Sequence, residues 1–96
     1  MDSQTLLKQI GTGNLMAVGA RDFTHDGNQL LFRVGSSRQL SKIVVTLTPA
    51  DEYTVRYVEL NRLTYEATVD KTEDADCTNV GTVVRRMGAS KFPHSP

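Results

Sequence analysis

Residues 43–69 read IVVTLTPADEYTVRYVELNRLTYEATV and decide the fold. Apolar and polar residues alternate over 43–48, which is typical of a β-strand with one buried face. Residues 49–52 (PADE) interrupt the alternation with turn chemistry, since proline presets φ and aspartate hydrogen-bonds its own backbone. The alternation resumes over 53–58, and Asn61 and Arg62 mark a second reversal before 63–69. The stretch therefore predicts three antiparallel strands in a meander.

Two further strands are expected upstream of this meander. Residues 29–34 alternate again, with Leu30, Phe32 and Val34 on one face. The run LMAVGA at 15–20 is short and apolar and predicts a buried strand, in which Gly19 marks a bulge or a close backbone approach. We expect a polar connection over 21–28 that contains the turn signal Asp26-Gly27.

Helical spacing occurs at both ends of the chain. Residues 2–10 predict a short helix, with a cap at Ser3 or Asp2 and Gly11 at the position of a C-terminal glycine. From Thr72 onward the apolar period becomes helical, and Thr72 or Asp74 can cap this second helix. Its predicted apolar stripe contains Cys77, Val80, Val83, Val84 and Met87.

Together these segments predict one α+β domain over residues 1–90, followed by a flexible tail at 91–96. Its core is an antiparallel sheet of about five strands, a meander, with a short N-terminal helix and a C-terminal helix. If both helices pack on one face, the apolar sides are covered and the other face stays wet. If each helix covers one face, both faces are buried, and the sequence leaves this alternative open.

Composition excludes several classes of protein. The chain has 96 residues, with 11 basic and 11 acidic side chains and hence no net charge, which removes the global electrostatic argument for a nucleic acid or an anionic membrane. The single cysteine cannot form a disulfide within the chain. The sequence also contains no signal-peptide pattern and no run of about 20 apolar residues. We therefore expect a cytoplasmic protein that does not enter a membrane.

No residues combine into a catalytic or metal site, so we expect neither an enzyme nor a cofactor. His25 and Asp26 are adjacent and could form a general-base pair, but both suit the turn at Gly27 equally well. Cys77 falls on the predicted apolar stripe beside acidic residues, which is unlike the electropositive setting of a reactive thiol.

Two surfaces remain as candidates for binding. An apolar patch that is out of phase with the core face suggests a protein partner; it comprises Leu31, Val44, Val58 and Leu60. A basic cluster in the strand region suggests a nucleic acid instead; it comprises Arg33, Arg38, Lys42, Arg56 and Arg62. Tyr53 and Tyr57 have the opposite phase to Arg56, so no aromatic platform for stacking bases is expected beside the charges.

A homodimer is a further open alternative, because an unpaired edge strand can pair with its copy. The candidates for such an edge are the strands at 29–34 and 63–69.

The segments LLKQIGTGNLMAVGARDF and KIVVTLTPADEYTVRYVEL resemble a family of small uncharacterised proteins encoded by phages and integrated mobile elements. The resemblance covers most of residues 5–60. It rests on an "MA-x-GA" segment with a following basic residue, at 16–21, and on a "V-x-L-x-P-x-D-x-Y-x-V" hairpin. The hairpin positions are Val45, Leu47, Pro49, Asp51, Tyr53 and Val55. The family's aromatic C-terminal helix and "TG-L-Y" tail are replaced here by VVRRMGASKFPHSP. The resemblance implies a small non-enzymatic protein that acts in a bacterial host by binding a protein or a nucleic acid.

Overall fold

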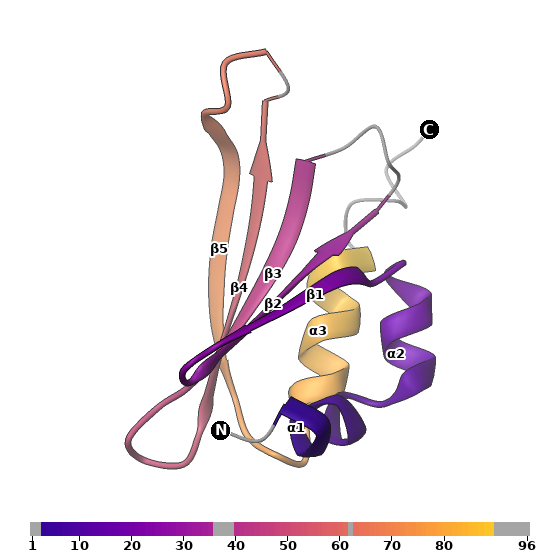
Figure 1. The fold of residues 1–96 in the computed structure, drawn as a ribbon, viewed down its shortest axis with the longest axis vertical. Helices are drawn as coiled ribbons and strands as arrows, with labels where there is room; N and C mark the ends of the chain where they lie inside the picture. Colours follow the sequence, from indigo (N-terminus) through magenta and orange to yellow (C-terminus); the bar gives the residue numbers. More distant parts are fainter. Residues whose placement is uncertain (1–2, 36–39, 62, 90–96) are drawn as a thin grey trace.

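A computed structural model describes residues 3–35, 40–61 and 63–89. These residues form three helices and five strands. In chain order they are α1 (Ser3–Ile10), α2 (Thr12–Ala17), β1 (Arg21–Asp26), β2 (Gln29–Val34), β3 (Leu40–Leu47), β4 (Tyr53–Leu60), β5 (Ala67–Ala75) and α3 (Val80–Ala89). The strands form one antiparallel sheet in the order β1-β2-β3-β4-β5, and the helices gather on one side of it (Figure 1). The α+β class and the meander are thus confirmed.

The central hairpin forms where the alternating pattern predicts it. β3 and β4 pair in register from Leu47 opposite Tyr53 to Leu40 opposite Leu60. The turn between them closes with the amide of Thr48, which donates to the carbonyl of Glu52 at 2.8 Å. Asp51 adopts a φ of 60° there, a left-handed conformation that aspartate tolerates better than most residues.

The segment 15–20 is not a strand, contrary to the prediction. Residues 12–17 form α2, and within 15–20 only Val18 is buried. The amide side chain of Asn14 donates to the carbonyl of Ile10 at 2.7 Å, so the chain enters a second helix directly after Gly11. Gly11 has a φ of 93° and separates the two helices, as its predicted C-terminal position requires. An apolar run this short suits either a strand or a helix.

Residues 21–26 form an edge strand, where a polar connection was predicted. Asp26 pairs with Gln29 across a two-residue turn in which Gly27 has a φ of 59°. Polar residues suit this strand because its outer edge lies at the margin of the sheet. Phe23 stays on the helix side and packs against Phe32, with the ring centroids 5.3 Å apart.

The last strand and the last helix lie further along the chain than predicted. The strand expected at 63–69 runs instead from Ala67 to Ala75, so residues 72–75 are extended rather than helical. Asp76 and Asn79 then form a reciprocal cap: each side chain accepts a hydrogen bond from the other's backbone amide, at 3.1 and 2.7 Å. Cys77 therefore lies exposed in the turn before α3 and not on its apolar stripe.

The core lies between the helices and one face of the sheet. The predicted stripe of α3 is buried apart from Cys77, and so are alternate residues of β2, β3 and β4. The buried cluster contains Leu6, Ile10, Val18, Leu30, Phe32, Val34, Ile43, Val45, Tyr53, Val55, Tyr57, Ala75, Val80, Val83, Val84 and Met87. Gly81 lets α3 approach the end of α1, because a Cβ there would lie 2.2 Å from the carbonyl oxygen of Ile10. Tertiary contact thus accounts for a glycine that is unfavourable inside an isolated helix.

The strand order decides which strands have a free edge. β2 (Gln29–Val34) lies between β1 and β3, so the prediction that it could pair with its own copy is wrong. The outer strands are β1 and β5, and β5 overlaps the second candidate at 67–69.

Candidate binding face

Among the residues that the structure describes, no helix covers the second face of the sheet, and we call this face the open face (Figure 1). The core residues of β2, β3 and β4 alternate with residues that point the other way, so register determines which side chains meet there. One row runs from Leu31 on β2 to Val44 on β3 and Arg56 on β4. The next runs from Arg33 to Lys42 and then to Val58. The patch predicted from the sequence therefore lies on one continuous surface with three of the predicted basic residues.

The apolar residues of the open face are not equally accessible. Leu31, Val44 and Leu60 are half-buried, whereas Val58 is only 6% exposed. Val58 is thus covered, unlike the other three residues of the predicted patch. In register, Val58 lies between Lys42 on β3 and Asp70 on β5, and long polar side chains readily cover an apolar neighbour with their stems. Val58 forms the floor of the face, and the three half-buried residues can contact a ligand.

The basic residues of the open face differ in whether a carboxylate of the protein already binds them. Arg56 binds both carboxylate oxygens of Asp70, at 2.9 and 2.7 Å. This paired hydrogen bond lowers the pKa of Asp70 from its ordinary value, because it stabilises the charged carboxylate. Arg33 lies 3.8 Å from a carboxylate oxygen of Asp22, at the outer limit of an ion pair. Lys42 forms no ion pair with any residue in the described ranges.

Two of the predicted basic residues, Arg38 and Arg62, lie outside the described residues. The structure places the other three on the open face, and only Arg33 and Lys42 are directly opposite each other on neighbouring strands. The phase argument about the tyrosines is confirmed. Tyr53 and Tyr57 are buried on the helix side, where they cannot stack with a base on the open face.

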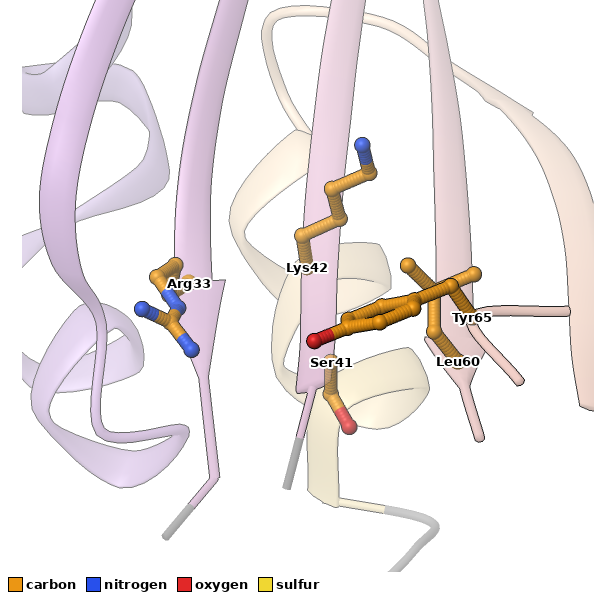
Figure 2. Close-up of a pocket in the computed structure, with 5 residues that line it drawn as sticks. All are labelled: Arg33, Ser41, Lys42, Leu60 and Tyr65. Atoms are coloured by element: carbon orange, nitrogen blue, oxygen red, sulfur yellow. The ribbon is translucent and has the colours of Figure 1, made fainter. Parts of the chain in front are cut away.

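A pocket of about 290 Å³ opens where β3 and β4 approach the β4–β5 loop. Its lining residues are Arg33, Ser41, Lys42, Leu60 and Tyr65. Figure 2 shows the Tyr65 ring lying between Leu60 and β3, with its hydroxyl directed toward that strand. Lys42 and Ser41 extend to opposite sides of the ring. The hydroxyl of Ser41 accepts a hydrogen bond from Tyr57 at 3.4 Å, so the charged groups that line the pocket are Arg33 and Lys42.

Hydrogen bonds within the β4–β5 loop hold Tyr65 over the pocket. The amide of Tyr65 donates to the carbonyl of Asn61 at 2.8 Å. The side chain of Asn61 accepts from the amides of Leu63 and Thr64, at 2.8 and 3.1 Å. Tyr65 itself has a φ of 60°, which is rare for a bulky residue and persists only where the surroundings impose it.

The β4–β5 loop belongs to the site although the sequence predicts a strand over 63–69, which would include Leu63 and Tyr65. Leu63 is 90% exposed and Tyr65 is 69% exposed, and large apolar side chains this accessible are typical of interaction surfaces when they adjoin others. Asn61 was the available signal, since asparagine often closes a turn by accepting from the amides that follow it.

The other candidate residues do not assemble into a reactive site. No group of three or more His, Cys, Asp and Glu side chains could hold a metal ion among the residues described. His25 and Asp26 lie exposed at the end of β1. Within the same residues, no helix has the length and apolar character needed to cross a membrane.

Comparison with known proteins adds no relative. No protein-family model matches the chain, no curated protein matches it, and no solved structure matches it. The resemblance to phage-encoded proteins stays a prediction, and the function must be inferred from the open face itself.

Proposed function

We propose that the protein is a non-enzymatic binding module that holds a segment of another protein against its open face. The observation that carries this proposal is the set of accessible apolar side chains on the open face and its adjoining loop. Leu31 and Val44 share one row, Leu60 lies beyond the row of Arg33, Lys42 and Val58, and the β4–β5 loop adds exposed side chains beside Leu60. Tyr65 lines a pocket and Leu63 is exposed in the same loop, and a partner that covers them removes apolar surface from water. The resemblance to phage-encoded proteins supports a partner in a bacterial host.

A nucleic acid is the alternative partner, and the charges of the open face favour it less. A polynucleotide requires a run of cations that neutralise successive phosphates. Here Arg56 is already paired with Asp70, and the outer strands place Asp26 and Asp74 at the ends of a neighbouring row. The available cations, Arg33 and Lys42, occupy one small area, which suits a single anionic group better than a chain of them.

A selection of random displayed peptides on the wild-type protein tests the proposal directly. Peptides that it enriches should lose about tenfold or more of their affinity when Leu31→Asp places a charge on the open face, since a central apolar contact commonly contributes that much. The matched control is Met16→Asp, because Met16 is 75% exposed on α2, in the helical layer. Circular dichroism spectra check that both variants fold.

Two outcomes contradict the proposal. One is a selection that enriches no peptide, or only peptides that bind the Leu31→Asp variant as well as the wild type. The other is saturable binding of labelled single- or double-stranded DNA, measured by fluorescence anisotropy, with an affinity that falls steeply between low and near-physiological salt. That second result would make the nucleic-acid alternative the function.

A further inference from the structure

The pocket beside the β4–β5 loop combines two positive charges with apolar walls. Arg33 and Lys42 are a directly paired cross-strand couple, and such pairs bring their Cβ atoms to within about 5.5 Å of each other. Like charges in this position repel each other. An anion bound between them relieves that repulsion and gains two charge-assisted hydrogen bonds.

The surrounding charges limit the anion to a single small group. Toward the sheet margins, Arg33 pairs in register with Arg21, whose guanidinium donates to the carbonyl of Gly35, and Lys42 pairs with Val58. The acidic groups on the two sides are Asp22, beside Arg33, and Asp70, in register beyond Val58. Asp70 is occupied by Arg56, and Asp22 lies 3.8 Å from Arg33. A carboxylate fits between the two cations, whereas an extended polyanion would run into the acidic margins on either side.

The other wall of the pocket requires an apolar group next to that carboxylate. Leu60 and the ring of Tyr65 form this wall (Figure 2). The volume of about 290 Å³ lies at the lower limit of ligand sites, which is enough for one or two side chains. The occupant that fits these walls is therefore a short peptide segment that presents both side chains to the pocket.

We propose that this pocket binds an acidic residue and an adjacent apolar residue of a partner peptide. The carboxylate lies between Arg33 and Lys42, and the apolar side chain packs against Leu60 and Tyr65. The inference rests on the proposed function, because it names the chemistry of the segment that the open face holds.

The test is a nuclear magnetic resonance titration of the ¹⁵N-labelled protein with capped tetrapeptides. The probe is Gly-Asp-Leu-Gly, and its two controls are Gly-Asn-Leu-Gly, which lacks the charge, and Gly-Asp-Ala-Gly, which lacks most of the apolar side chain. We expect saturating shifts at the amides of Arg33, Lys42, Leu60 and Tyr65. The asparagine peptide should bind about tenfold more weakly, because a charge-assisted contact is lost.

Variants of the protein provide the reciprocal measurement. Arg33→Gln combined with Lys42→Gln should abolish the preference for aspartate over asparagine, and Tyr65→Ala should abolish the preference for leucine over alanine. Lys8→Gln removes one positive charge from the exposed side of α1 and should leave both preferences unchanged. The amide spectra show in the same experiment whether each variant is folded.

Failure of this inference is distinguishable from failure of the proposed function. Equal binding of the aspartate and asparagine peptides, shifts outside the pocket, or no shift at about 10 mM peptide, far above the range of specific sites, would overturn the inference. If the affinity of peptides selected by display still depended on Leu31, the proposed function would nevertheless stand. Tighter, salt-sensitive binding of a single-stranded oligonucleotide at the same amides would overturn both.

Discussion

Replacing Gly81 by alanine tests the packing that holds the helices against the sheet. An alanine in a helix interior is favoured over glycine by about 1 kcal/mol, so local propensity alone predicts a more stable protein. The structure predicts the opposite, because the new Cβ would lie 2.2 Å from the carbonyl oxygen of Ile10 and 2.6 Å from the side-chain nitrogen of Asn14. Both atoms belong to the hydrogen bond that joins α1 to α2.

The size of the effect follows from these opposing terms. Overpacking of this kind costs typically about 1–3 kcal/mol, and the upper end applies because the nearest atom is backbone and cannot rotate away. Weakening the bond between Asn14 and Ile10 adds about 1 kcal/mol. After the gain in helix propensity is subtracted, Gly81→Ala should lower the free energy of unfolding by about 3 kcal/mol, or the melting temperature by about 15 °C.

Urea unfolding followed by circular dichroism measures this change, with the midpoint shifting at a constant slope. Gly13 is the matched control, since it is also helical and nothing lies within 4 Å of a Cβ placed there. Gly13→Ala should therefore stabilise the protein by up to about 1 kcal/mol. The reasoning fails if Gly81→Ala is as stable as the wild type, because α1 and α3 would then not meet as closely as described.

Three further changes probe the cap, the anchor of α1 and the open face. The Asp76 carboxylate accepts hydrogen bonds from Thr78 and Asn79, which lower its pKa. Its contribution to stability is therefore present above pH 3.8 and is lost as the pH falls below that value. The urea midpoint of Asp76→Asn should fall less on acidification than that of the wild type, and parallel curves of midpoint against pH would refute this role. Tyr53 donates to Gln9 at 2.7 Å, so Tyr53→Phe should cost about 1 kcal/mol in urea unfolding at neutral pH. Burial, followed by the charges of Cys77 and Asp51, raises the pKa of Tyr53 above 10.0. The neutral phenol thus stabilises the fold below that pH, and this stabilisation is lost as the pH rises through the raised pKa. The Tyr53→Phe variant should therefore lose less stability than the wild type at alkaline pH, and an equal loss would contradict this prediction. Val58→Ala removes two buried methyl groups and should lower the free energy of unfolding by about 1.5 kcal/mol. The same change at the half-buried Val44 should lower it less. Equal decreases in the urea unfolding curves would mean that Val58 is no more buried than Val44.

Much of the fold can be predicted because its signals are local. Alternation over 29–34 and 43–58 identifies three strands, and the turn residues at 26–27 and 49–52 identify how the chain reverses. Gly11 marks the end of α1 for the same reason, because its positive φ depends only on the glycine itself and the residues next to it. These features depend on the conformational preferences of a few adjacent residues.

Other elements depend on partners that are distant in the sequence. β1 is extended because β2 offers it hydrogen bonds, and residues 72–75 are extended because β4 does the same. The sequence of either segment suits a loop or a helix start when it is considered alone. The run at 15–20 likewise becomes a helix and turn that bury Val18. In each case tertiary contact outweighs a weak local preference.

The sequence by itself determined that a meander would exist and that Leu31, Arg33 and Val44 would be out of phase with its core. Only the tertiary structure decided that the helices leave this face open, that Arg33 and Lys42 are directly opposite each other, and that Tyr65 lies beside them. The physical reason is that phase along a strand is a property of the strand, whereas register and burial are properties of the pairs and layers that it joins.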